Sequence, residues 1–431
     1  MHPNVHITVM TTEPFVLSPV ITIDLDTIAS ALGYAWYQAQ YLAQDDHRKM
    51  IALVPTPRAD FSLRPENIHA LALADISHPF MELLCPEDLP VPHKFTDYAL
   101  VDHNILSARY SSPDARVVAI IDHHNDEGKY RDTAYPRIIE KCGSCASLVT
   151  SLYISRSTSD NRTQILPELA ALLLSAITID TKGLQKGGDA VEIDRTAATW
   201  LLPYAKKAPA IASTPEGKTP DDPGTREISG DPLILSLEDT LNSKKTAVSN
   251  LSTRDLLRRD YKQSTFQPSS SSSQNTTGTI QAGLSTVPLS MSTFFKSDLA
   301  SVAADIVEWM EERSLSILGV LMTYRNKNDK KRRKQLWIVD ERNHNNGLSL
   351  ALFHGLEIEQ TFSLERVGIT WYADGSKDDN DNEDDHKGEA PSSSVESSLF
   401  KDGFVSRAYK QNNKDASRKQ IAPILKRIVE G

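Results

Sequence analysis

RVVAIIDHHND, residues 116–126, joins a run of mainly β-branched hydrophobic residues directly to acidic, imidazole and amide side chains. A short apolar run rich in Val and Ile predicts a buried β-strand. The polar cluster cannot continue a buried strand, so Asp122 should stand where the strand ends. In parallel α/β sheets, functional side chains gather at the carboxyl ends of the strands. This stretch therefore predicts a buried parallel strand with a functional site at its end.

Strand-like and helix-like segments alternate on both sides of this stretch. Strands are predicted at residues 19–23, 50–55, 98–101 and 116–121, and helices at residues 28–42, 144–154, 167–179 and 193–204. This alternation is typical of α/β proteins with a doubly wound, mostly parallel sheet. We therefore expect an α/β fold whose first domain spans residues 1–205.

The second half of the chain differs in composition. Residues 206–231 are rich in Pro, Gly and charge and predict a linker, followed by a smaller α/β domain at residues 232–431. There we expect helices at 232–262, 297–313 and 417–429 and strands at 315–324 and 335–340. Polar inserts at about 267–278 and 376–398 should be disordered. The basic run KNDKKRRK, residues 327–334, predicts a solvated hairpin loop or, alternatively, a surface that steers a long polyanion.

Composition limits the expected location and partners. The net charge of −10 argues against a general nucleic-acid binder. The cysteines Cys85, Cys142 and Cys145 are too few and too irregular for a disulfide framework or a structural zinc site, which favours a reducing compartment. The first residues lack a signal-peptide pattern, and the longest apolar stretch, residues 169–179, is about half a membrane span. We expect a cytoplasmic protein that binds neither nucleic acid nor membranes.

Three other segments place acidic residues after apolar runs. ITIDLD (21–26) contributes Asp24 and Asp26, LVDHN (100–104) contributes Asp102, and LLLSAITID (172–180) ends at Asp180. Carboxylates and imidazoles that converge at one edge of a sheet form a mixed oxygen and nitrogen site for divalent ions. Four carboxylates carry about −4 and two divalent ions about +4, so the occupied site would be near neutral. The pattern therefore predicts a site for two divalent metal ions.

The paired motifs Asp-His-Asn at 102–104 and Asp-His-His at 122–124 resemble the signatures of the DHH phosphoesterase superfamily, and the likeness covers nearly the whole chain. It implies two Mn²⁺ or Mg²⁺ ions held by Asp24, Asp26, Asp102, His123 and Asp180. It also implies that His124 lies beside the scissile phosphate. Asp122 and His103 would hold these residues in position without binding the metal themselves.

Further motifs resemble the branch that contains fungal exopolyphosphatases, prune-type proteins and family II inorganic pyrophosphatases. They are Gly-Ser-Cys-Ala-Ser at 143–147, Asp-Tyr-Lys at 260–262 and Ser-Arg-Lys-Gln at 417–420. The likeness implies that substrate is bound in a cleft between the two domains by Ser144, Lys262, Arg418 and Lys419. N–H groups at a helix start suit an anion, and Arg and Lys suit phosphate oxygens. The alternatives are an ordinary N-cap at Ser144 and a solvated basic helix start.

The resemblance implies an exopolyphosphatase, in which a metal-activated water releases orthophosphate from the end of inorganic polyphosphate. One alternative is an inorganic pyrophosphatase or a prune-like enzyme acting on short polyphosphates or cyclic nucleotides. A departure favours a third hypothesis, a catalytically weakened interaction protein. The family usually has a His or a Gly-Asn-Glu segment just ahead of its Asp-x-Asp pair, whereas Val20 stands four residues before Asp24 here. A Val side chain cannot ligate a metal.

Overall fold

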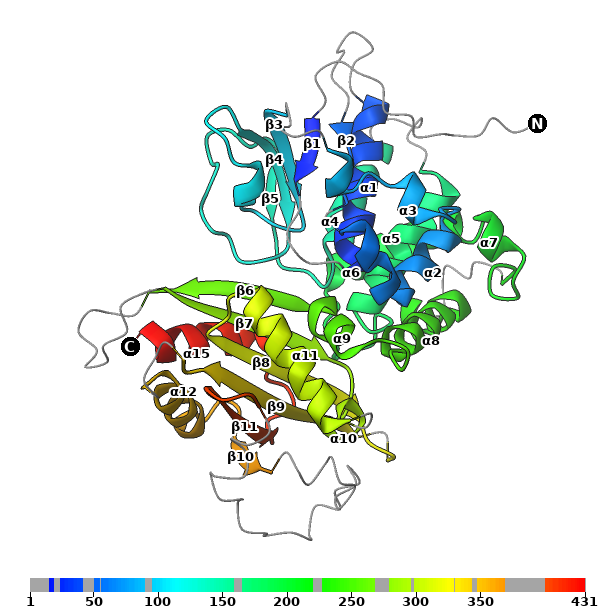
Figure 1. The fold of residues 1–431 in the computed structure, drawn as a ribbon. Helices are drawn as coiled ribbons and strands as arrows, with labels where there is room; N and C mark the ends of the chain where they lie inside the picture. The colour runs from blue at the N-terminus through cyan, green and yellow to red at the C-terminus, as the bar shows by residue number, and fades with distance from the viewer. Residues whose placement is uncertain are drawn as a thin grey trace. The chain divides into compact units, whose positions relative to one another are not determined.

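The computed structural model describes residues 15–18, 24–41, 50–54, 56–89, 95–158, 165–219, 227–267, 279–295, 298–328, 330–342, 347–368 and 400–430. The chain divides into two compact units, Met1–Ala247 and Val248–Gly431 (Figure 1). Each unit contains one sheet with helices, which confirms the expected α/β class. The strand expected at 19–23 and the inserts expected at 267–278 and 376–398 lie outside the described residues, apart from Gln267.

The sheet of the first unit is parallel, with the strand order β2-β1-β3-β4-β5. Its strands are β1 (Phe15–Ser18), β2 (Met50–Ile51), β3 (Asp97–Val101), β4 (Arg116–Asp122) and β5 (Arg137–Ile139). The apolar run at residues 116–121 forms most of β4, as predicted. Val101 pairs with Ile121 across β3 and β4, so the polar residues that follow these two strands emerge side by side.

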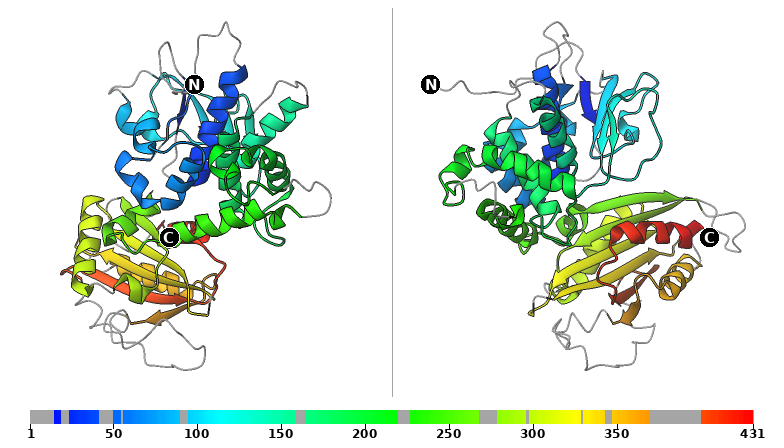
Figure 2. Two further views of the ribbon diagram at one scale, coloured as in Figure 1. Left: turned by 90° about the vertical axis from the view of Figure 1, so that its right-hand side faces the viewer. Right: turned by 180° about the vertical axis from the view of Figure 1, so that it is seen from behind.

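Helices pack on one face of this sheet (Figure 2). They are α1 (Leu25–Tyr41), α2 (Pro65–Leu73), α4 (Cys145–Ser157), α5 (Pro167–Asp180) and α6 (Glu192–Ala205), with the short α3 (Pro79–Glu82) nearby in the chain. Ala119 and Ile121 pack into the core with these helices, whereas Leu100 and Ile120 pack with Tyr110 in a separate cluster. The division follows from the two-residue period of a strand, whose successive side chains point to opposite faces.

An ion pair joins the two ends of residues 206–231, the segment that was expected to link the domains. Nζ of Lys206 lies 3.1 Å from Oδ2 of Asp231, and both residues are buried. The segment contains α7 (Pro209–Ala212), and α8 (Pro232–Thr246) follows it. Leu233, Ile234 and two further leucines of α8 lie in the core of the first unit. The division between the units therefore follows α8, whereas the sequence analysis placed this helix in the second domain.

The second unit has a mixed six-stranded sheet in the order β10-β11-β9-β8-β7-β6, in which β7 and β8 are parallel and the other neighbours antiparallel. Its strands are β6 (Tyr261–Phe266), β7 (Ile280–Val287), β8 (Ile317–Arg325), β9 (Lys331–Asp340), β10 (Leu364–Val367) and β11 (Phe404–Gln411). Its helices are α9 (Thr253–Arg259), α10 (Met291–Phe294), α11 (Leu299–Glu312), α12 (Gly347–Ile358) and α15 (Arg418–Glu430).

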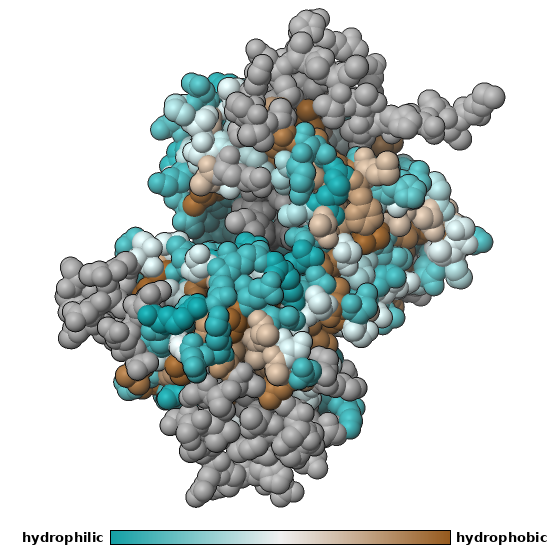
Figure 3. Space-filling view, viewed as in Figure 1, coloured by the Kyte–Doolittle hydropathy of each residue, from teal (hydrophilic) through white to brown (hydrophobic). Residues whose placement is uncertain are grey.

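Helices cover both faces of this second sheet. Val320 and Leu336 belong to the core shared with α9, α10 and α11, whereas Leu321 and Trp337 belong to the core shared with α12 and α15. On the face of the unit drawn in Figure 3, hydrophilic residues predominate and hydrophobic residues lie in small groups. Among the described residues, no helix combines the length and the apolar character that crossing a membrane requires.

Two predictions for the second half were wrong. The helix expected at 232–262 ends at Thr246, and α9 begins after Ser252, whose hydroxyl accepts the N–H of Asp255 at 3.1 Å. Residue 262 then lies in β6 rather than in a helix. The basic run at 327–334 is not all loop, because β9 begins at Lys331 and pairs with β8. Lys334 is 2% exposed, since a long side chain can bury its aliphatic stem within a sheet.

Candidate functional site

The candidate site forms at the carboxyl ends of β3 and β4. Asp102 is the first residue after β3, and its backbone N–H donates to the carbonyl oxygen of Ile121 at 2.9 Å. Its φ of 64° lies in the left-handed region, which Asp enters more readily than most residues. Asp102 is buried. The ladder and the turn therefore fix its carboxyl group beside the end of β4.

His123 faces two of the predicted acidic ligands. Its Nε2 lies 3.2 Å from Oδ1 of Asp102 and 3.8 Å from Oδ2 of Asp26. Its Nδ1 lies 3.0 Å from the carbonyl oxygen of Cys142, and because a carbonyl only accepts, Nδ1 must carry the proton of this hydrogen bond. Neutral His123 therefore presents the lone pair of Nε2 toward the acids. This is the arrangement of a histidine that ligates a metal.

Burial and charge shift the pKa values of this cluster. Burial raises the pKa of Asp26, and the charge of Asp24 adds to the effect while His123 opposes it. Burial and the charge of Asp26 raise the pKa of Asp102 to about 7. Burial works to lower the pKa of His123, but its contacts with Asp102 and Cys142 outweigh burial and raise that pKa to about 12. The cluster thus favours a bound positive charge, which a proton or a divalent cation can supply.

Asp122 orients the second histidine. Nδ1 of His124 lies 2.8 Å from Oδ1 of Asp122, and the His124 backbone N–H donates to the same oxygen at 3.1 Å. The other oxygen of Asp122 accepts from the side-chain amide of Asn104. Burial opposes the charged form, but these hydrogen bonds lower the pKa of Asp122 to about 2. Asp122 is therefore a carboxylate at neutral pH and holds a proton on Nδ1 of His124, whose side chain is 43% exposed.

Thr27 connects Asp24 to Asp102. The Thr27 N–H donates to Oδ1 of Asp24 at 3.1 Å. The Thr27 hydroxyl lies 2.8 Å from the same oxygen and 2.5 Å from Oδ2 of Asp102, and its single proton can serve one of them at a time. Oδ1 of Asp102 is buried and accepts no hydrogen bond among the described residues. It therefore keeps lone pairs available for a cation.

Asp26 caps the start of α4. Its Oδ2 accepts the N–H of Cys145 at 2.6 Å, and its Oδ1 accepts the N–H of Ala146 and the hydroxyl of Ser144, both at 2.8 Å. A carboxylate is favoured at a helix N-terminus, where N–H groups lack partners within the helix. Ser144 is fully buried. The donors predicted to bind a substrate anion are thus used by an acid of the protein itself. Ser144 stands at the N-cap position, but its hydroxyl donates to Asp26 and does not cap the helix, so the alternative of an ordinary N-cap is not what the structure shows either.

Asp180, the last residue of α5, belongs to the same electrostatic cluster. Burial raises its pKa well above the usual value, and the charges of Asp26 and Asp24 raise it further, while the positive charge of Lys245 on α8 opposes them. Charges interact in this way only when they are close. Hydrogen bonds and close contacts thus join Asp24, Asp26, Asp102 and His123, and Asp180 interacts electrostatically with the three acids of this group.

His103 supports the turn after β3. It is buried, and its Nδ1 lies 2.8 Å from the carbonyl oxygen of Val101, to which it must donate. Burial lowers the pKa of His103 to about 4, so the ring is neutral at pH 7. Its Nε2 makes no hydrogen bond among the described residues. His103 thus contributes a neutral ring packed under the loop that carries Asp102.

The donor set fits a divalent cation. Asp102, His123 and His124 can each offer one ligand atom such that these atoms lie within 4.8 Å of one another. Carboxylate oxygens suit Mg²⁺ and Mn²⁺, and imidazole nitrogen suits Mn²⁺ and other transition metals. Two further observations favour a bound cation. Oδ1 of Asp102 accepts no hydrogen bond among the described residues, and the raised pKa of Asp180 reflects a crowding of negative charge that a cation would relieve.

The predicted substrate cations lie in the second unit. Arg418, at the start of α15, donates to the carbonyl oxygen of Asp260 at 2.8 Å and pairs with its Oδ1 at 2.8 Å. Lys262 is exposed on β6, two residues beyond Asp260. The side chain of Lys419 lies outside what the structure describes. The structure therefore brings the start of α15 to the β6 edge of the sheet, where Lys262 also stands.

Three supporting residues have roles that the sequence analysis did not assign. Asn104 donates to the carbonyl oxygen of Asn125 at 2.9 Å as well as to Asp122, and Asp194 accepts the N–H of Gly143 at 2.9 Å. The third is Thr27. The Asp-His-Asn motif was a signal for Asn104. Thr27 and Asp194 look like ordinary helix-start residues, so their sequence gives no comparable signal.

Two family models match the chain. The DHH family, N-terminal domain, matches residues 20–177, and the DHHA2 domain matches residues 239–428. The first match includes Asp102 and His123, and the second includes Lys262 and Arg418. The chain therefore combines a DHH domain with a DHHA2 domain.

Two curated relatives that match part of this chain are named as exopolyphosphatases. A Schizosaccharomyces pombe protein named "Putative exopolyphosphatase" is 32% identical over 250 residues, which are 56% of this chain and 57% of that protein. "Exopolyphosphatase PRUNE1" of Mus musculus is 28% identical over 244 residues, 56% of this chain and 47% of the relative. The chain thus matches about half the length of these curated relatives.

One solved structure shares the fold across both units. The crystal structure of a Methanococcus jannaschii protein named as a "putative family II inorganic pyrophosphatase" aligns with a TM-score of 0.55 and 18% sequence identity. The alignment covers 97% of this chain and 100% of that one. At this identity the likeness establishes a common fold.

Proposed function

We propose that the protein is an exopolyphosphatase that hydrolyses the terminal phosphoanhydride of inorganic polyphosphate and releases orthophosphate. The observation that carries the proposal is the meeting of Asp102, His123 and His124 at the ends of β3 and β4. The names of the yeast and mouse relatives support polyphosphate as the substrate. Inorganic pyrophosphate is the second candidate, because the fold is shared with a protein named as a pyrophosphatase.

In this proposal Asp24, Asp26, Asp102, His123 and Asp180 hold two divalent ions, Mn²⁺ or Mg²⁺. When bound, such ions neutralise phosphate charge and lower the pKa of a water molecule, which makes it a nucleophile near neutral pH. The protein's contribution is to fix the ligands before the ions arrive. The Cys142 carbonyl sets the tautomer of His123, and the start of α4 holds the carboxylate of Asp26.

His124 is the proposed catalytic residue. Asp122 fixes a proton on Nδ1 of His124, so Nε2 is the ring atom that gains or loses a proton during the reaction. A neutral ring can accept a proton from the attacking water, and the resulting imidazolium can donate to a phosphate oxygen. Because the pKa of Asp122 is lowered to about 2, this orienting contact persists throughout the neutral and mildly acidic range.

Arg418, Lys419 and Lys262 are the proposed substrate cations. The planar guanidinium of Arg418 offers paired N–H groups to phosphate oxygens, and its contacts with Asp260 hold it in one orientation. Lys262 adds a compact charge on the neighbouring strand β6. Ser144 is excluded from direct substrate contact in this arrangement, since it is fully buried against Asp26. A cytoplasmic location, with neither nucleic acid nor membrane as a partner, remains our expectation from the sequence.

The test is orthophosphate release by the purified chain with Mn²⁺ or Mg²⁺ from long-chain polyphosphate, tripolyphosphate and pyrophosphate in parallel. An exopolyphosphatase releases orthophosphate from the two polyphosphates with a higher kcat/KM than from pyrophosphate. The reverse order would establish the second candidate. No metal-dependent release from any of the three would contradict both and favour a weakened interaction protein.

A further inference from the structure

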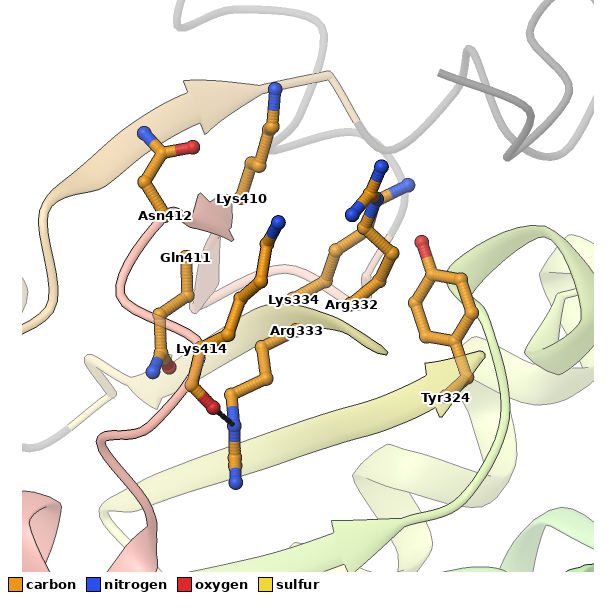
Figure 4. A pocket seen from close by; sticks show the side chains of 8 residues that line it. All are labelled: Tyr324, Arg332, Arg333, Lys334, Lys410, Gln411, Asn412 and Lys414. Atoms are coloured by element: carbon orange, nitrogen blue, oxygen red, sulfur yellow. Dashed lines mark hydrogen bonds between the residues drawn. The ribbon is translucent and has the colours of Figure 1, made fainter. Parts of the chain in front are cut away.

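A basic pocket of about 310 Å³ lies in the second unit, on strands β8, β9 and β11 (Figure 4). Among the described residues that line it, five of eight are cationic and none is acidic. They are Tyr324, Arg332, Arg333, Lys334, Lys410, Gln411, Asn412 and Lys414. None of these residues belongs to the substrate set proposed above. The pocket is therefore a second concentration of positive charge on the DHHA2 domain.

The strand register brings two lysines of the pocket together. Lys334 of β9 and Lys410 of β11 are direct partners across an antiparallel ladder, and Arg332, two residues before Lys334, lies on the same face of β9. Like charges directly opposite each other destabilise a sheet pair. Lys334 and Arg332 are also buried, at 2% and 7% exposure. Nζ of Lys410 also lies 3.9 Å from Oε2 of Glu365 on β10, so part of the positive charge is balanced from the neighbouring strand.

The loop that supplies Lys414 is held by several hydrogen bonds. Nε of Arg333 donates to the carbonyl oxygen of Lys414 at 2.8 Å, and a terminal nitrogen of Arg333 donates to the hydroxyl of Thr323 at 3.1 Å. The side-chain amide of Gln411 donates to the carbonyl oxygen of Ala416 at 2.8 Å. The site is thus preformed on rigid strands and a fixed loop. That loop, residues 412–417, leads directly to Arg418 at the start of α15.

We propose that this pocket binds an internal stretch of an inorganic polyphosphate chain, away from the phosphate that is hydrolysed. The inference rests on the proposed function and extends it to the body of the substrate. Cations from β9, β11 and the 412–417 loop match a ligand that carries negative charge at regular intervals. Single-stranded nucleic acid fits less well, because it binds through stacked aromatic rings. Tyr324 is the sole aromatic lining residue, and the Lys334 ammonium lies 5.8 Å from its ring centroid.

The test measures binding rather than turnover. The full chain is kept metal-free with a chelator and titrated with fluorescently labelled long-chain polyphosphate at several salt concentrations. The variant is Lys410→Gln with Lys414→Gln, two partly exposed positions whose folding is checked by thermal unfolding. The matched control is Lys401→Gln with Lys426→Gln, which removes the same charge from exposed sites of the same unit.

The pocket variant should bind polyphosphate at least about fivefold more weakly, and the slope of log Kd against log salt should fall by about two, one for each lost cation. The control should bind like the parent. Equal weakening in both variants, or no weakening in the pocket variant, would overturn the proposal. So would a labelled RNA that binds the parent more tightly than polyphosphate and loses its binding in the pocket variant. If the parent binds polyphosphate through this pocket but releases no orthophosphate with Mn²⁺, the proposed function fails and the binding site stands.

Discussion

The Nε2 atom of His123 lies 3.2 Å from Oδ1 of Asp102, although the two residues follow different strands. The contact joins the two histidine motifs of the chain at one point. It also sets Nε2 of His123, whose ring is oriented by the Cys142 carbonyl, against an acid with a raised pKa. Several measurable properties depend on this relationship.

His123→Ala should reduce metal-dependent phosphate release by more than about a hundredfold, because it removes a ligand that no neighbour can replace. Calorimetric titration with Mn²⁺ should show weaker or lost binding in the same variant. The control is His354→Ala, an exposed position on α12 of the second unit, which should leave both properties unchanged. Near-parental phosphate release by His123→Ala would refute the metal assignment.

The metal-free protein should become less stable as the pH rises from 7 to 9. The pKa of His123 is raised to about 12 in the folded state, so the folded chain keeps a proton that the unfolded chain releases above about pH 6.5. His123 alone should therefore contribute a fall in the free energy of unfolding of at most about 1.4 kcal/mol per pH unit. Denaturant unfolding of the parent and of His123→Gln, both in a chelator, would measure it. An equally steep decline in the variant would contradict this origin.

Asp122→Asn should lower kcat by about 10- to 100-fold while KM and Mn²⁺ affinity change little, because the substitution weakens the hold on the Nδ1 proton of His124 without removing a metal ligand. Steady-state kinetics on tripolyphosphate and metal titration together give the answer. Loss of Mn²⁺ binding in this variant would show that Asp122 acts on the metal cluster instead of on His124.

Arg418→Ala should raise KM for polyphosphate by about tenfold or more and leave the Mn²⁺ affinity unchanged, since it removes a forked contact to phosphate. Arg418→Lys should recover part of this loss, because it keeps the charge but not the fork. Arg427→Ala, at an exposed position of the same helix, is the matched control. An unchanged KM in Arg418→Ala would remove Arg418 from the substrate site.

Ser144→Ala should lower the free energy of unfolding by about 1–3 kcal/mol, because a buried hydroxyl that donates to Asp26 is lost. KM should stay near the parental value. Chemical denaturation and kinetics on the same preparation separate the two effects. A large rise in KM without a change in stability would restore Ser144 as a substrate ligand.

Much of the first unit could be predicted from the sequence because its signals are local. The run at 116–121 and the helices at 167–179 and 193–204 have strong apolar patterns and lie at nearly the predicted bounds. The meeting of Asp102 and Asp122 followed from the rule that parallel strands end at one edge, whereas Asp26 and Asp180 belong to the helices α1 and α5. The use of Asp26 by the start of α4 could not be predicted, since it depends on a contact between residues 118 to 120 positions apart.

The second unit was harder to predict because its basic residues suggested a solvated loop where the structure has a strand. The basic residues at 331–334 suggested solvent, yet pairing with β8 draws them into a strand. The single helix expected at 232–262 corresponds to three elements in the structure, α8, α9 and the start of β6. The sequence did not indicate the breaks between them, because no Gly or Pro stands near Val248 or Asp260. The two boundaries are set by which core each segment packs into, and that is a property of the folded chain.

The ion pair between Lys206 and Asp231 makes the chain leave α6 and return to α8 at nearly the same point. A segment whose two ends meet can change its length without altering the elements on either side, because loop-closure entropy grows only slowly with length. Exposed positions of this segment such as Ser213 and Pro215 are therefore a natural place for evolution or an engineer to insert a tag, a recognition peptide or a further domain, whereas Ala208 and Ile211 belong to the core. The helices α6 and α8 would keep their positions.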